Sequence, residues 1–133
     1  MSPLRTFIVE DSALILDNLV ATLEELADVK VVGAVGDERA AVSWMQRPDV
    51  SCDLMIIDIF LKSGSGLGVL RAAVEAGVPA KRVVLTNYAT PDIRRRCAEL
   101  GADRVFDKSN ELEDLIAYCG RLADGSTAPG PLS

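Results

Sequence analysis

Five polar side chains that could together bind a divalent cation and a phosphoryl group each stand at the end of a short apolar run. They are the adjacent pair Glu10 and Asp11, then Asp58, Thr86 and Lys108. In an open parallel α/β sheet, ligands bind at the carboxyl ends of the strands, where the strand order reverses. The sequence therefore predicts that three acids, one hydroxyl and one amine meet at one edge of such a sheet.

The three acids predict a metal site. Carboxylates held close together raise one another's pKa, and a bound divalent cation removes that penalty. Hard cations such as Mg²⁺ take oxygen ligands and keep several waters, and Mn²⁺ is a second choice. We expect Asp11 and Asp58 as direct ligands and Glu10 as a ligand through water. The chain has no histidine and no Cys-x-x-Cys pair, which argues against zinc.

Asp58 is also placed to act as a nucleophile. A carboxylate can attack phosphorus and form an aspartyl phosphate. Lys108 would place a positive charge against the phosphoryl oxygens, and Thr86 would donate its hydroxyl to another of them. Movement of Thr86 toward the phosphoryl group could pull residues 87–90 with it, so that a covalent change becomes a change of shape.

The elements that must position these groups alternate along the chain. Apolar runs predict strands at residues 6–9, 30–35, 53–57, 82–85 and 104–106, each followed by a segment of helical spacing. This alternation predicts the α/β class, with a flavodoxin-like doubly wound five-stranded parallel sheet in the order 2-1-3-4-5. Five helices would cover both faces of the sheet.

Local signals mark the helix ends and faces. Ser12 is the expected N-cap of the first helix, and Pro48 is expected to end the second. Apolar faces are expected to include Leu26 in the first helix and Val74 in the third. Further predicted features are an end of the third helix at Gly77, Pro91 in the first turn of the fourth helix and Gly101 at its end.

Composition excludes several classes. The chain has 133 residues and a net charge of −6, which favours one domain and argues against binding of nucleic acid. No run approaches the roughly 20 apolar residues of a membrane span. The N-terminus has no signal-peptide pattern, so we expect a cytoplasmic protein. The three cysteines Cys52, Cys97 and Cys119 are expected to be reduced, and residues 125–133, rich in Gly, Ser and Pro, to be flexible.

Several segments in this order resemble the receiver domain of two-component response regulators. They are Phe7-Ile8-Val9-Glu10-Asp11-Ser12, Leu54-Met55-Ile56-Ile57-Asp58, Gly64-Ser65-Gly66-Leu67, Val84-Leu85-Thr86, Gly101-Ala102-Asp103 and Phe106-Asp107-Lys108. The resemblance implies a receiver domain over residues 1–124 that is a phosphoacceptor rather than an enzyme acting on a separate substrate.

The resemblance also implies roles and partners. Asp58 would accept a phosphoryl group from a phosphohistidine on a sensor histidine kinase or a histidine phosphotransfer protein. Phe60 would give a backbone carbonyl to the metal, Thr86 would be the switch hydroxyl, and Lys108 would bind the phosphate. The face made by the fourth helix, the fifth strand and the fifth helix would contact a downstream protein or a second copy.

The chain departs from the family pattern at four positions. Ser109 stands where proline often follows the lysine, and Val105 stands where an aromatic switch residue is usual, with Phe106 next to it. Asn87 replaces a small residue, and Lys62 stands where proline is frequent. An aromatic switch would therefore have to use Phe106 or Tyr88.

Two further groups carry hypotheses. Phe60 and Tyr88 each lie two residues beyond a site residue, and they either shield an acyl phosphate from water or only pack the loops. Residues 94–96, three arginines, form either a solvated basic face or a docking surface. In the second case acids at 111, 113 and 114 would pair with these arginines across a symmetric interface.

Three other functions compete with phosphoacceptor signalling. A degenerate receiver would act only as an interaction module. A phosphatase of the haloacid-dehalogenase type needs a second acid two residues after its nucleophile, where Phe60 stands. A flavodoxin-like cofactor binder would need a glycine-rich phosphate loop after the first strand, where Glu10 and Asp11 stand. With only eleven residues after Leu122, we expect either a single-domain receiver or a piece of a longer regulator.

Overall fold

The computed structural model describes residues 3–49 and 51–125, in which strands and helices alternate. The elements are β1 (Leu4–Val9), α1 (Ala13–Leu26), β2 (Val29–Val35), α2 (Glu38–Met45), β3 (Leu54–Ile57), α3 (Gly66–Glu75), β4 (Lys81–Thr86), α4 (Pro91–Glu99), β5 (Arg104–Asp107) and α5 (Leu112–Ala123). The part of the chain that the structure describes thus contains every strand and helix that the sequence predicts. The remaining tail, residues 126–133, lies outside the described residues.

The strands form one parallel sheet in the order β2-β1-β3-β4-β5, as predicted. Register places Val9 opposite Ile57 and Ile57 opposite Val84, while Thr86 lies opposite Asp107. The carboxyl ends of β1, β3, β4 and β5 are therefore neighbours at one edge of the sheet.

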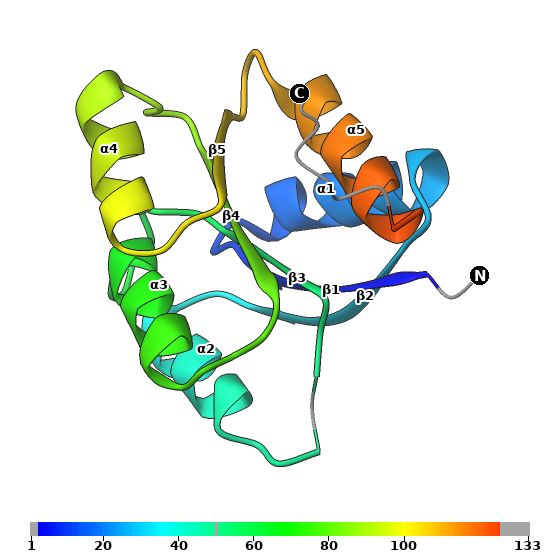
Figure 1. Cartoon of the computed structure of the whole chain (residues 1–133). Coiled ribbons are helices and arrows are strands. Elements are labelled where there is room, and N and C mark those ends of the chain that lie inside the picture. Colours follow the sequence, from blue (N-terminus) through cyan, green and yellow to red (C-terminus); the bar gives the residue numbers. More distant parts are fainter. Residues whose placement is uncertain (1–2, 50, 126–133) are drawn as a thin grey trace.

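Helices cover both faces of the sheet, and Figure 1 shows α1 and α5 on one side with α2, α3 and α4 on the other. Successive strand residues point to opposite faces, so each strand supplies both layers. Phe7, Met55 and Val84 pack in the layer of α2, α3 and α4. Ile8, Ile56 and Val83 pack in the layer of α1 and α5. Because both faces of the sheet are buried, the strands appear in the sequence as continuous apolar runs.

Short polar side chains fix where the helices begin. The Ser12 hydroxyl accepts the Ile15 N–H at 3.3 Å, as predicted for an N-cap. Pro91 occupies the first turn of α4. Gly77 and Gly101 follow α3 and α4 with φ of +67° and +103°, a conformation that disfavours residues with a side chain. These glycines end their helices as predicted.

The predicted burial of two side chains and the predicted strand bounds are wrong. Leu26 and Val74 are 62% and 48% exposed rather than inward. Leu26 is the last residue of α1, and Val74 Cγ2 would lie 2.6 Å from a Cβ at Gly101, just beyond α4. Helix α2 ends at Met45, shortly before Pro48, as predicted. The strands also differ from the predicted bounds by one or two residues, so that Thr86 is the last residue of β4 rather than the first beyond it.

All three cysteines are free and buried. Burial raises the pKa of Cys52 to about 11 and that of Cys119 to about 12, so these thiols act as small apolar side chains. Within residues 3–49 and 51–125, none of the helices is long and apolar enough to cross a membrane.

Candidate functional site

Backbone hydrogen bonds just beyond the strands fix the positions of the predicted site residues. The Asp58 N–H donates to the Val9 carbonyl at 2.9 Å, beside Glu10. The Lys108 N–H donates to the Thr86 carbonyl at 2.9 Å. The sheet therefore holds two pairs of site residues together without any contribution from their side chains.

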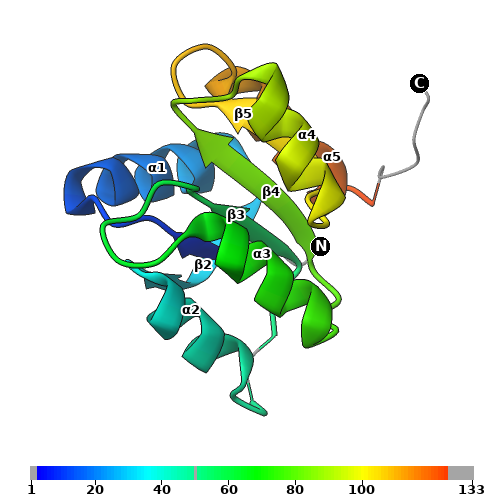
Figure 2. The ribbon, with the colours of Figure 1, turned by 90° about the vertical axis from the view of Figure 1, so that its left-hand side faces the viewer.

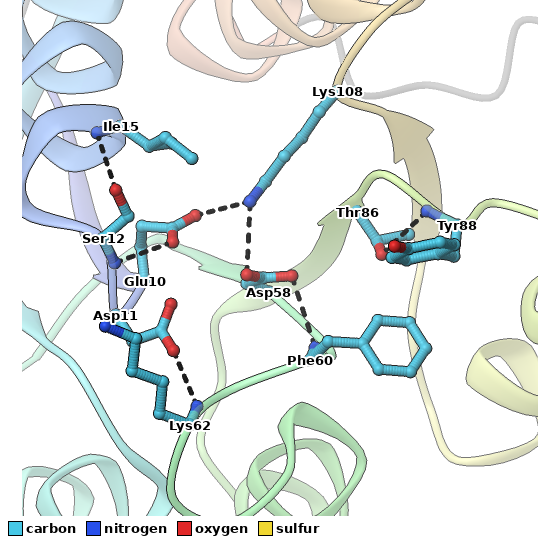
Figure 3. Close-up of polar contacts among 10 residues, drawn as sticks. All are labelled: Glu10, Asp11, Ser12, Ile15, Asp58, Phe60, Lys62, Thr86, Tyr88 and Lys108. Atoms are coloured by element: carbon cyan, nitrogen blue, oxygen red, sulfur yellow. Dashed lines mark hydrogen bonds and ion pairs between the residues drawn. The ribbon is translucent and has the colours of Figure 1, made fainter.

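Lys108 reaches across the sheet edge to two acids (Figure 3). Its ammonium donates to Glu10 Oε1 at 2.7 Å and to Asp58 Oδ2 at 3.2 Å. The three side chains are only 12%, 3% and 10% exposed, in the order Lys108, Glu10, Asp58. Because water is largely excluded, these ion pairs act in a medium of low dielectric constant.

Burial and neighbouring charges shift the pKa of both central groups. Burial raises the pKa of the Asp58 carboxyl, and the Glu10 charge adds to this; Lys108 opposes the shift without cancelling it. Burial works to lower the pKa of Lys108, but the bonds and charges of Glu10 and Asp58 together outweigh it and raise that pKa. Lys108 therefore stays an ammonium, and ionised Asp58 is a costly state that a cation would relieve.

The predicted acids form a cluster with oxygen donors only. Glu10, Asp11 and Asp58 each offer a carboxylate oxygen, and these oxygens lie within 4.8 Å of one another. Glu10 also accepts the Ser12 N–H at 3.0 Å, and Asp11 accepts the Lys62 N–H at 2.6 Å. Three carboxylates and a single ammonium give the site a net negative charge. A hard divalent cation would balance that charge.

The loop between β3 and α3 folds back over Asp58. The Phe60 N–H faces Asp58 Oδ1 at 3.4 Å, and the Gly66 N–H donates to the Ile59 carbonyl at 2.9 Å. A Cβ at Gly66 would lie 2.1 Å from the Asp58 carbonyl oxygen. Glycine at position 66 therefore permits the backbone of Gly66 to approach that of Asp58 closely, which keeps Phe60 beside the acids. The Phe60 carbonyl was predicted to bind the metal there.

Thr86 is fully buried at the end of β4. Its hydroxyl oxygen accepts the N–H of Tyr88 at 3.2 Å, so the side chain is tied to the loop after its own strand. Beyond it, the rings of Phe60 and Tyr88 meet edge to face, 5.0 Å apart at their centroids. Figure 3 shows this pair beside Asp58, on the side away from Glu10.

Sequence reasoning missed two residues that organise the surrounding loops. Arg94 was predicted to lie either on a solvated basic face or on a docking surface, where acids such as Glu111 would pair with it across an interface. In the structure its guanidinium donates within the chain, to the carbonyls of Ala89 and Val105 and to Glu111. That bond with Arg94 lowers the pKa of Glu111. Glu38 accepts the Ser65 N–H at 2.8 Å. Ser65 lies 27 residues from Glu38, and Glu111 lies 17 residues from Arg94. No local spacing in the sequence therefore signals these two contacts.

Comparison with known proteins places residues 6–119 in the family described as the response regulator receiver domain. The transcriptional regulatory protein YvfU of Bacillus subtilis (strain 168) is 32% identical over 130 residues, which cover 96% of this chain and 63% of that protein. A protein-glutamate methylesterase/protein-glutamine glutaminase of Azospirillum brasilense is 30% identical over 116 residues, which cover 85% of this chain and 29% of that protein. The chain thus spans less than two thirds of these relatives.

Solved structures share the fold. The signal receiver domain of NarL from Mycobacterium tuberculosis superposes with a TM-score of 0.82 at 20% identity, covering 94% of this chain and 99% of that one.

Proposed function

This chain belongs to the response regulator receiver domain family, and on that premise we propose that it is a phosphoacceptor of a two-component phosphorelay. The observation that supports this most directly is the position of Asp58, with Lys108 on one oxygen and two more acids within 4.8 Å. That arrangement combines a nucleophile, a phosphate-binding cation and a metal-binding cluster in one site.

Asp58 takes the phosphoryl group from a phosphohistidine on a sensor histidine kinase or a histidine phosphotransfer protein. An oxygen of its carboxylate forms a bond to phosphorus while the phosphorus–nitrogen bond of the donor breaks, and the donor imidazole keeps the electron pair. Mg²⁺ held by Glu10, Asp11, Asp58 and the Phe60 carbonyl would supply charge neutralisation between carboxylates and phosphoryl oxygens. Lys108 moves its ammonium from Asp58 Oδ2 to a phosphoryl oxygen and stabilises the added charge.

Thr86 converts the covalent change into a movement. Its hydroxyl turns to donate to a phosphoryl oxygen, and its bond from the Tyr88 N–H is lost. The loop at residues 87–90 then shifts, and Arg94, bound to the Ala89 carbonyl, carries the shift to β5 and α5. The surface of α4, β5 and α5 is the proposed contact for a downstream protein or a second phosphorylated copy.

The proposal is tested by intact mass after incubation with Mg²⁺ and acetyl phosphate, a small phosphodonor. The wild type and an Asp49→Asn control should each gain one phosphoryl group, whereas Asp58→Asn and wild type with chelator should gain none. A gain that persists in Asp58→Asn would contradict the proposal. Mg²⁺ binding without any gain, from acetyl phosphate or a phosphohistidine donor, would favour an interaction module that works without phosphorylation.

A further inference from the structure

The carboxylate of Glu38 lies against the loop that covers the site. Glu38 is the first residue of α2, and this helix lies side by side with α3 on one face of the sheet (Figure 2). Its Oε1 accepts the Ser65 N–H at 2.8 Å, and its own N–H donates to the Ser63 carbonyl at 3.4 Å. The start of α2 is thus joined to the end of the β3–α3 loop by two hydrogen bonds.

Two glycines make room for this carboxylate. A Cβ at Gly68 would lie 2.3 Å from Glu38 Oε2, and a Cβ at Gly64 would lie 2.4 Å from the Glu38 Cβ. Gly64 also has a φ of +80°, a backbone conformation that side chains disfavour. Side chains at positions 64 and 68 would displace Glu38. The position of the Glu38 carboxylate therefore depends on glycine at both positions.

Three acids face the N–H groups of this one loop: Asp58 at the start of the loop itself, Asp11 after β1 and Glu38 in α2. Asp58 faces the N–H of Phe60, Asp11 accepts that of Lys62, and Glu38 accepts that of Ser65. Asp11 and Asp58 also belong to the acid cluster, so a cation there competes for their oxygens. Glu38 lies outside the cluster, so a cation bound there would not compete directly for the carboxylate oxygen that accepts the Ser65 N–H.

We propose that Glu38 is a positioning residue for the metal site. By fixing the backbone at Ser65, it holds residues 59–65 where the N–H groups of Phe60 and Lys62 face Asp58 and Asp11. The Phe60 carbonyl is proposed to bind the cation from this same loop. This inference rests on the proposed function, because it assigns a role toward the cation that the acid cluster is proposed to bind. Residues that orient metal ligands without touching the metal commonly change its affinity strongly when removed.

A role in capping α3 alone would be a simpler explanation, but the helix already has its cap. The Ser65 hydroxyl accepts the Leu67 N–H at 3.1 Å. A negative charge near a helix N-terminus also adds a modest stabilisation. A purely stabilising role would lower the unfolding free energy of a Glu38 variant and leave its Mg²⁺ affinity unchanged, and the two roles are therefore separable by experiment.

The test is a titration of the chain with Mg²⁺ alone, followed by the amide resonances of residues 58–65. Glu38→Gln and Glu38→Ala have the same net charge, but only the glutamine keeps an oxygen that can accept the Ser65 N–H. We expect Glu38→Ala to bind Mg²⁺ roughly tenfold more weakly than Glu38→Gln, with faster hydrogen exchange at the Lys62 amide. Glu99→Ala, a remote acid at the end of α4, should match the wild type.

Glu38→Asp provides a second comparison should the alanine variant fail to fold. It keeps the charge of the wild type but withdraws the carboxylate by one methylene, so it should also bind Mg²⁺ more weakly. Equal Mg²⁺ affinity of the folded Glu38→Ala and Glu38→Gln variants would overturn the positioning role of Glu38 but not the metal site. If Glu38→Ala does not fold, equal affinity of Glu38→Asp and the wild type would have the same meaning. A wild type that binds no Mg²⁺ would instead overturn the metal site of the proposed function, and the role of Glu38 with it.

Discussion

At the scale of single residues, the site gathers charge at a cost to stability. Asp58 lies in a largely buried position beside Glu10, and the cation that would relieve it is not part of the chain. Burial raises the pKa of Asp58 even with Lys108 in contact, so ionised Asp58 is disfavoured in the folded state. Function and stability therefore oppose one another at this residue.

Replacement of Asp58 by asparagine should raise the melting temperature at neutral pH without Mg²⁺. The folded pKa lies above the ordinary Asp value of about 3.9, so the folded chain keeps its proton where the unfolded chain has lost it. Wild-type stability then falls as pH rises through the window between the ordinary and the folded pKa. Thermal unfolding across this window should show the gap between Asp58→Asn and wild type widening from acid to neutral pH.

Asp53→Asn is the matched control with the opposite sign. The bond from Arg5 lowers the pKa of Asp53, so that carboxylate stabilises the fold above the ordinary Asp pKa, and this contribution is lost as pH falls. Asp53→Asn should therefore be less stable than wild type at neutral pH. An Asp58→Asn variant that also loses stability there would refute the cost assigned to ionised Asp58.

Phe60 and Tyr88 are 51% and 61% exposed, and their rings contact one another beside Asp58 (Figure 3). We expect them to exclude water from an acyl phosphate on Asp58. Phe60→Ala and Tyr88→Ala should each shorten the phosphoryl lifetime severalfold, measured as loss of the phosphorylated mass with time. Leu26→Ala, equally exposed but remote, should not, and unchanged lifetimes in both ring variants would mean that the pair only packs the loops.

At the scale of elements, Arg94 joins the β4–α4 loop, β5 and the start of α5. Its guanidinium reaches the Ala89 carbonyl at 3.0 Å, the Val105 carbonyl at 3.1 Å and Glu111 at 2.6 Å. Only a planar fork of several donors can serve three acceptors in different directions. In this chain Val105 offers no aromatic ring, and Arg94 provides a connection between the same elements.

Arg94→Lys should lower the free energy of unfolding by about 1–2 kcal/mol, because an ammonium cannot keep all three hydrogen bonds. Arg95→Lys is the control, since Arg95 pairs with Asp92 at the surface, where the two side chains are 68% and 85% exposed. Its change should stay within about 0.5 kcal/mol. Urea unfolding compares the two variants, and equal losses would show that the fork geometry of Arg94 contributes nothing.

The elements also show what a sequence can predict. Strands, caps such as Ser12 and stops such as Gly77 depend on residues within a few positions, so their signals are local. The polar residues at the strand ends were predictable because parallel strands bring their carboxyl ends together. Glu38 was missed because its partner Ser65 lies 27 residues away. Glu111 was predicted to pair with the arginines at 94–96 across an interface, whereas the structure pairs it with Arg94 of the same chain, 17 residues away. Such contacts depend on how α2 packs on α3 and on how α4 and α5 each pack against β5.

At the scale of the whole molecule, binding at one edge of the sheet should stabilise the entire fold. A ligand that binds only the folded chain adds about 2.7 kcal/mol when its concentration is a hundred times its dissociation constant. Saturating Mg²⁺ should therefore raise the urea midpoint of the wild type, with NaCl of the same ionic strength as control. Asp11→Asn should show a much smaller rise, and an equal rise in that variant would place Mg²⁺ elsewhere.

The central claim is that the Asp58 carboxylate carries the phosphoryl group, and the most direct measurement is to locate that group in the chain. Borohydride reduces an acyl phosphate to the alcohol, so phosphorylated Asp58 becomes homoserine, whereas phosphate esters of serine or threonine do not react in this way. Peptide mass analysis of the chain treated with Mg²⁺ and acetyl phosphate should find homoserine at position 58 and nowhere else. Homoserine at position 11, or a phosphate that remains on Ser or Thr after reduction, would contradict the claim.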